Sequence, residues 1–169
     1  MLRERGWFER YEALLSAEDR AALNAIVPAV WVPVTMIRAH YVACDRLEMT
    51  VSEQLAMGHG LSNRMHKPVF AVSVRLANAA GVTPWTLAAQ ATKMWPRMYD
   101  GGAFVTEQLG PKEARVEILG FPCADLRYCR TAWRGIILGG AELFAQRAYV
   151  SDIASMSDAL TLCYRVSWA

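Results

Sequence analysis

The sequence predicts an α+β single domain, in which N-terminal helices pack with a four-stranded antiparallel sheet made of two hairpins separated by a long helix. Apolar residues recur at helical spacing through the first hundred residues, and after Gly102 they alternate instead. A second helical stretch then separates two pairs of alternating runs. We expect one domain over 1–169, with a helical part over about 1–100 and a hairpin–helix–hairpin part over about 101–169.

The first two helices carry clear start signals. A helix over 16–27 begins with Ser16 as cap and Asp19 three residues later, and Pro28 ends it. The next helix begins at Pro33, since proline suits a first turn. Its apolar positions form one stripe that places Cys44 on the buried face: Val34, Ile37, Tyr41, Cys44 and Leu47.

Three further helices complete the helical part. One starts at Thr50 or Ser52 and is loosened by the two glycines of "MGHGLSN", and another runs over about 68–80. The last has Thr83 as cap and Pro84 at its first position. Pro96 kinks or shortens it, and the stretch 100–102 (Asp-Gly-Gly) stops it.

The C-terminal part alternates between strands and a helix. A hairpin is expected over 103–120 with its turn at 109–112, then a helix over 125–146, then a hairpin formed by 147–153 and 160–168. The last strand has one continuous apolar face, which predicts a central position in the sheet. Cys163 lies on its opposite face, which the long helix could cover.

Composition excludes several classes of function. The 169 residues are 54% hydrophobic and 20% charged, with a net charge of +2 and no Lys/Arg run longer than two. We therefore expect neither nucleic-acid binding nor attraction to an anionic membrane. The chain contains no stretch of 18 apolar residues, so the sequence predicts no membrane span. The charged N-terminus has no apolar signal region, so we expect a cytoplasmic protein with reduced thiols.

The cysteines and histidines give little sign of a metal site. Cys44, Cys123, Cys129 and Cys163 contain no C-x-x-C pair, which argues against zinc. His40 lies beside an apolar stripe and is expected to be a hydrogen-bonded or surface histidine without a ligand role.

His59 stands between glycines, seven residues before His66, and these two are the candidate metal or heme ligands. Without a nucleophile motif, phosphate-binding loop or dinucleotide fingerprint, the sequence does not predict an enzyme, and we expect no catalytic residues.

Aromatic residues supply the candidate binding site. Trp95 and Tyr99 lie four residues apart at the end of a predicted helix, and Trp133 lies on the long helix. These rings either fill the core or line a pocket between helices and sheet. In the second interpretation they hold an apolar ligand that Arg97 or Arg130 orients.

The order of several short motifs resembles a known family. The motifs are Trp31-x-Pro33, "PRMYDGG" (96–102), Gly110-Pro111 with "ARVEILGFP" (114–122), "RGIILGGAELFA" (134–145) and the terminal "DALTLCYRVSW" (158–168). Together they resemble a family of uncharacterised domains typical of myxobacteria. That family is similar to the superfamily of heme-nitric-oxide-binding, four-vinyl-reductase and TRAPP vesicle-tethering domains. The resemblance implies two hairpins separated by a long helix, and a ligand-sensing or scaffolding role, often as a dimer and without catalysis.

The chain departs from these relatives at two motifs. They frequently carry two cysteines before the terminal aromatic residue, and here Cys163 matches the second whereas Ser155 or a neighbour stands at the first. The heme-binding branch uses a proximal histidine and a Tyr-x-Ser-x-Arg clamp. In "AVSVR" the chain keeps Ser73 and Arg75 but has Ala71 at the tyrosine position.

The leading hypothesis is a non-catalytic regulatory or sensory domain that binds a small apolar ligand or a protein partner and forms a homodimer. Its candidate ligand-binding residues are Trp95, Arg97, Tyr99, Arg130 and Trp133. One alternative is a heme- or metal-binding sensor that uses His59 or His66. Another is a structural assembly subunit that resembles vesicle-tethering proteins.

Overall fold

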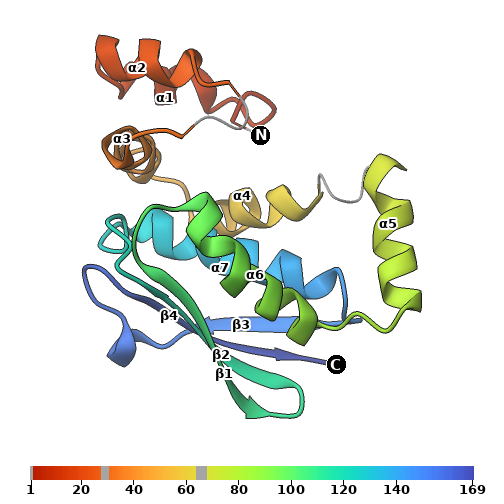
Figure 1. The fold of residues 1–169 in the computed structure, drawn as a ribbon. Coiled ribbons are helices and arrows are strands. Elements are labelled where there is room, and N and C mark those ends of the chain that lie inside the picture. Colours follow the sequence, from red (N-terminus) through yellow and green to blue (C-terminus); the bar gives the residue numbers. More distant parts are fainter. Residues whose placement is uncertain (1, 28–30, 64–67) are drawn as a thin grey trace.

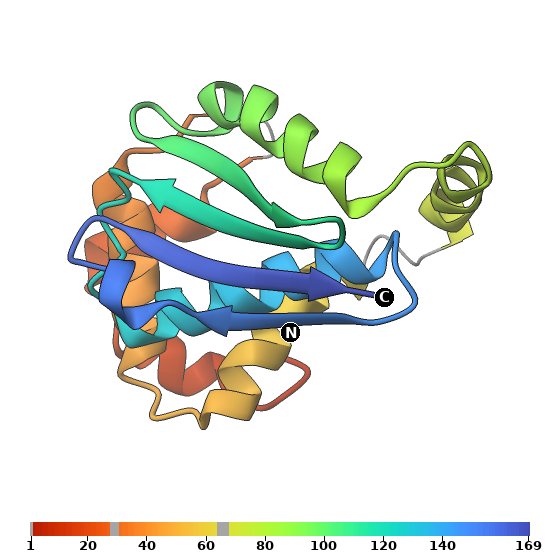
Figure 2. The ribbon, with the colours of Figure 1, turned by 90° about the horizontal axis from the view of Figure 1, so that it is seen from below.

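The computed structural model describes residues 2–27, 31–63 and 68–169, which form an α+β fold with one four-stranded antiparallel sheet. In Figure 1 helices α6 and α7 lie over one face of the sheet, and α4 lies on the far side of α7. Figure 2 shows the strands in front of the α-helices, so none of the described α-helices covers the other face of the sheet. The predicted α+β class and antiparallel sheet are confirmed.

The described residues form seven α-helices, four strands and a short 3₁₀ helix. Their bounds are α1 Phe8–Ala13, α2 Ala17–Asn24, α3 Val34–Asp45, α4 Val51–Asn63, α5 Pro68–Ala79, α6 Pro84–Met98, β1 Ala103–Gly110, β2 Glu113–Leu119, α7 Arg127–Glu142, β3 Ala148–Asp152, the 3₁₀ helix Ala154–Met156 and β4 Leu162–Trp168.

The N-terminal helices follow their start signals more closely than their expected ends. The Ser16 hydroxyl accepts a hydrogen bond from the Asp19 amide at 2.9 Å, as the capping pattern predicts. Helix α2 ends at Asn24, so Ile26 and Val27 lie beyond it and are exposed, and the prediction of a helix to residue 27 was wrong. On α3, Cys44 is fully buried, as predicted.

Helix α4 continues through the glycines that were expected to loosen it. A Cβ atom on Gly58 would lie 1.9 Å from the carbonyl oxygen of Ala132, and one on Gly135 would lie 2.2 Å from that of Leu55. These glycines therefore let α4 and α7 approach at backbone distance. That contact, and the continuous hydrogen bonding of the helix, overrides the weak helix propensity of glycine.

Helices α6 and α7 are anchored at their first turns. Thr83 forms a capping box with Thr86 at the start of α6, and Pro96 is accommodated inside the helix without ending it. The Asp45 carboxylate at the end of α3 accepts the Tyr128 amide at 2.7 Å, and so satisfies an N–H group at the start of α7.

The sheet has the strand order β1-β2-β4-β3, and all three pairings are antiparallel. β4 is central, as its apolar alternation predicts. Its residues Leu162, Tyr164 and Val166 share one core with Cys129 and Trp133 of α7. The long helix therefore covers this apolar face, and the expectation that it covers the Cys163 face was wrong.

Cys163 is buried beside the connection between β3 and β4. Its amide donates to the Ser157 hydroxyl at 3.1 Å, and its carbonyl accepts from the Ile153 amide at 2.9 Å. Burial raises the pKa of its thiol, which opposes reactivity. All four cysteines are buried and unpaired. None of the helices described is long and apolar enough to cross a membrane.

Candidate functional site

A pocket of about 470 Å³ lies between α6, α7 and the helix-covered face of the sheet. Its volume falls in the range of small-molecule sites. Helix α6 and the residue after it contribute Pro84, Trp85, Leu87, Ala88, Ala91, Trp95, Met98 and Tyr99. The remaining lining residues are Tyr41 of α3, Phe104, Ala114, Val116, Val166 and Trp168 of the sheet, and Trp133, Ile136, Ile137, Gly140 and Ala141 of α7.

One end of the pocket is an aromatic cluster. Trp95 and Tyr99 stack with their ring centroids 4.3 Å apart, because one helical turn brings them to the same side of α6. The ring of Trp133, on α7, lies with its centroid 5.9 Å from that of Trp95. The Phe121 ring packs edge to face on Trp133, with the centroids 5.7 Å apart. The Trp95 indole donates to the Gly101 carbonyl at 3.3 Å. Three of the five candidate residues thus lie together on this wall.

The other end of the pocket is formed by Trp85 and Trp168, whose rings meet edge to face at 4.9 Å. The Trp85 indole donates to the Pro111 carbonyl at 3.0 Å and so ties the start of α6 to the turn of the first hairpin. A Cβ atom on Gly140 would lie 3.2 Å from the end of Leu87, so α6 and α7 come close here.

The described lining of this pocket carries no charged side chain. Its hydroxyl groups belong to Tyr41 and Tyr99. Burial raises the pKa of Tyr99 to about 12 and that of Tyr41 further, so both phenols are neutral at physiological pH. The pocket therefore suits an uncharged, apolar guest.

A second pocket, of about 920 Å³, adjoins the first and shares Trp95, Met98 and Tyr99 with it. Arg97 lines this pocket, together with Asp100 and residues 31–34 before and at the start of α3. Arg97 thus lines the second pocket and not the apolar one.

Arg130 lies outside both pockets. Its guanidinium donates to the Ala124 carbonyl at 2.6 Å and to the Asp158 carbonyl at 2.8 Å. Its own carbonyl accepts from the Tyr164 hydroxyl at 2.8 Å. It joins the segment before α7 to the β3–β4 connection, and the structure does not bring it to the other candidates.

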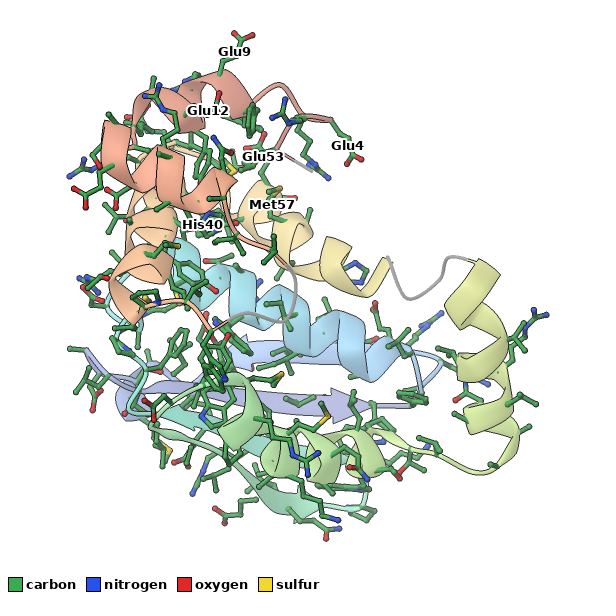
Figure 3. All side chains as sticks on the ribbon, turned by 45° about the horizontal axis from the view of Figure 1, so that its top comes forward. Glu4, Glu9, Glu12, His40, Glu53 and Met57 are labelled. Carbon is green, nitrogen blue, oxygen red and sulfur yellow. The ribbon has the colours of Figure 1, made fainter. Side chains whose placement is uncertain are left out.

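The described histidines also lie away from the apolar pocket. His59 contacts Glu142 of α7, with Nε2 and Oε2 2.6 Å apart. His40 of α3 lies under the N-terminal helices, near α4 (Figure 3), and hydrogen-bonds to the Tyr11 hydroxyl at 2.8 Å. His66 lies outside the described residues. Within the described ranges, no three His, Cys, Asp or Glu side chains are grouped as metal ligands.

No protein-family model and no curated protein matches the sequence. Solved structures do match the fold. An Fe(II) unliganded H-NOX protein from K. algicida superposes with a TM-score of 0.67 at 9% identity, over 99% of this chain and 90% of that one. The chain has the H-NOX fold.

Other H-NOX structures also match the fold of this chain. An oxygen-binding H-NOX domain related to soluble guanylate cyclases has a TM-score of 0.59 at 11% identity, over 99% of this chain and 88% of that one. An H-NOX protein from S. oneidensis in the Fe(II)NO state has a TM-score of 0.58 at 14% identity, over 96% of this chain and 88% of that one. The resemblance to heme-nitric-oxide-binding domains is thus confirmed for the fold.

The residues of the apolar pocket do not fit a histidine-held heme. Heme iron in proteins is bound by His, Cys or Tyr, or by Met paired with His. The described lining offers no His or Cys, and its two tyrosines hold their protons. It also offers no cation for the heme carboxylates. Helix α5, which carries Ala71, Ser73 and Arg75, contributes none of the described lining residues.

Much of the pocket was not predictable from the sequence. Tyr41 and Trp168 belong to predicted apolar stripes, but such stripes do not distinguish a packed core from a pocket wall. The small residues Ala88 and Ala91 make room on α6, and an alanine in a helix looks like an ordinary helix former. The alternation of β4 was the one signal that could have found Val166 and Trp168.

Proposed function

We propose that this chain is a non-catalytic sensory or regulatory domain that binds a small, uncharged, apolar molecule between α6, α7 and the sheet. The observation that carries the proposal is the 470 Å³ pocket with an uncharged, aromatic lining. An open pocket lined by apolar and aromatic side chains leaves apolar surface in contact with water, which costs stability. A pocket of this size is therefore better explained by a ligand than by packing.

The lining also favours binding over catalysis. Enzyme sites place a nucleophile or a general base within hydrogen-bond reach of the reacting groups. Around this pocket the described side chains are aliphatic, aromatic or small, apart from the two protonated phenols and Met98. Helix α6 lines the pocket and packs on β1 of the first hairpin, so we expect it to be the element that responds to the ligand.

Filling the pocket tests the proposal. Ala91 of α6 lines the pocket, so Ala91→Phe places a ring where the ligand would lie. We expect the affinity for Nile red, an uncharged apolar dye, to fall by about 10-fold or more, as measured by fluorescence titration. Native mass spectrometry of the purified wild-type chain reports any molecule that is retained during purification.

Ala89→Phe is the matched control, because Ala89 is an exposed residue of the same helix outside the pocket lining. Its affinity for Nile red should equal that of the wild type. Equal loss in both variants, or no dye binding by the wild type, contradicts the proposal. A Soret band that appears with hemin in the wild type and vanishes in Ala91→Phe would instead favour the heme sensor.

The heme sensor is supported by the fold likeness to H-NOX proteins, and the donor set of the pocket opposes it. The structural assembly subunit predicts a closed core, and the pocket opposes that alternative. We further propose that the domain forms a homodimer and is cytoplasmic, as the sequence suggests. The dimer is compatible with a sensory role, because ligand binding can then alter the contact between two copies.

A further inference from the structure

The aromatic end of the apolar pocket holds three hydrogen-bond donors without a partner among the described residues, and one of them, Trp133 Nε1, is fully buried. The Trp133 Nε1 atom is buried without a partner among the described residues, and the side chain is only 8% exposed. Tyr41 and Tyr99 are half-buried, and their hydroxyls have no hydrogen-bond partner in the part of the chain that the structure describes. All three side chains line the same pocket.

Aromatic donors elsewhere in this core are satisfied. The indoles of Trp85 and Trp95 donate to backbone carbonyls, and the hydroxyls of Tyr11 and Tyr164 bond to His40 and to the Arg130 carbonyl. Buried donors are rarely left unpaired, because each one loses its hydrogen bonds to water on folding. Trp133 Nε1 is thus the one buried aromatic donor without a partner among the described residues, whereas Gln54 Oε1 and Thr106 Oγ1 are buried without a partner outside the pocket.

An indole N–H only donates, and a neutral phenol readily donates. A guest with an acceptor atom could thus accept a hydrogen bond from the Trp133 indole or from a tyrosine hydroxyl of the pocket. A purely hydrocarbon guest could not. An anionic guest would supply acceptors, but it would lose its hydration without meeting a cation in the described lining.

We propose that the ligand is an uncharged, largely apolar molecule that carries a hydrogen-bond acceptor, such as a ketone, which Tyr41 or Tyr99 binds beside Trp133. This inference rests on the proposed function, since it names the chemical class of the molecule in the same pocket. It predicts that ketones, esters, ethers and heteroaromatic bases bind in this pocket in preference to plain hydrocarbons and to acids.

The test compares three probes with the same ring system: 2-acetylnaphthalene, the isosteric hydrocarbon 2-isopropenylnaphthalene, and 2-naphthoate. Binding to the full chain is measured by equilibrium dialysis for the wild type, Tyr41→Phe, Tyr99→Phe and the double variant. Because each substitution removes only a hydroxyl without a protein partner, thermal unfolding should be unchanged. We expect the double variant to bind the ketone about 3- to 10-fold more weakly and the hydrocarbon equally well.

The outcomes separate this inference from the proposed function. If ketone and hydrocarbon change alike in the double variant, the acceptor inference is overturned while the pocket stands. If naphthoate binds most tightly and loses affinity in Arg97→Gln, the ligand is an acid and the inference is also overturned. If the wild type binds none of the three probes and no Nile red, the proposed function itself fails.

Discussion

At the residue scale, His40 shows how burial controls a titratable group outside the pocket. It lies on α3 against Tyr11 of α1, with a 2.8 Å hydrogen bond, and its ring stands 5.5 Å from that of Tyr41. The Cys44 thiol lies 3.8 Å from its Nε2 atom. Burial lowers the pKa of His40 below its ordinary value of 6.5, because the imidazolium would lose its hydration.

This lowered pKa predicts a pH-dependent stability. The unfolded chain binds a proton at His40 near pH 6.5, whereas the folded chain resists it until lower pH. The free energy of unfolding is therefore highest above pH 7, where His40 is neutral in both states. It falls as the pH drops below the pKa of His40 in the unfolded chain, toward its lower pKa in the folded chain. We expect a loss of up to about 1.4 kcal/mol per pH unit between pH 6.5 and 5.5, measured by urea unfolding.

The variant His40→Gln provides the control for this prediction. It keeps a polar group next to the Tyr11 hydroxyl but does not titrate, so its free energy of unfolding should change less between pH 7.5 and 5.5. Carboxylates with lowered pKa values, such as Asp125 beside Arg38, lose their contribution only at lower pH. An equal slope in variant and wild type would show that another group carries the effect.

Single residues were predictable where their cause is local. The Ser16 cap and the shared helix face of Trp95 and Tyr99 follow from spacing along one element. The placement of Arg130 did not follow, because its acceptors, Ala124 and Asp158, belong to loops whose meeting depends on the whole fold.

At the element scale, the contact between α4 and α7 depends on two glycines that face each other's helices. Gly58 of α4 lies on the Ala132 carbonyl, and Gly135 of α7 lies on the Leu55 carbonyl. From the sequence alone, the glycines near His59 were expected to loosen this helix. Glycine has weak helix propensity whatever its neighbour, and spacing within one helix does not reveal which other helix will need the missing side chain.

This close contact predicts an unequal cost for the same substitution within α7. In Gly135→Ala the new methyl group meets backbone atoms at 2.2 and 2.8 Å, so the two helices must separate. We expect a loss of about 1–3 kcal/mol in the free energy of unfolding, measured by chemical denaturation.

Gly140→Ala is the comparison, because its methyl group meets only the flexible end of Leu87, at 3.2 Å. There the better helix propensity of alanine offsets the contact, and we expect a change within about 0.5 kcal/mol. Similar costs at both positions would show that backbone proximity is not the cause.

At the scale of the whole molecule, the class and order of elements could be predicted because alternation and helical spacing are properties of the chain itself. The α+β class, the central place of β4 and the helix between the strand pairs follow from these patterns. The face that α7 covers could not be predicted from β4 alone, since Cys163 and Leu162 are both apolar enough to be buried. The pocket depends on side chains from α3, α6, α7 and three strands, so it exists only once these have met.

Helix α5 stands beside the rest of the fold, at the right of Figure 1 and of Figure 2. Asn78 holds its last turn to the fold, by donating to the Leu143 carbonyl at 3.0 Å. Val72 and Leu76, one turn apart on α5, are 51% and 67% exposed. An amphipathic helix gains most of its stability by burying its apolar face, so we expect this exposed pair to contact a partner.

The proposed homodimer would cover this face of α5. We expect the wild-type chain to have the mass of a dimer by light scattering at 50 µM, and Leu76→Asp to have the mass of a monomer, because a buried carboxylate opposes the contact. Met156→Asp is the control, since Met156 is an exposed apolar side chain on the 3₁₀ helix between β3 and β4. A monomeric wild type would remove the dimer from the proposal, and a dimer that survives Leu76→Asp would place its contact elsewhere. Neither result would affect the pocket, because no described residue of α5 lines it.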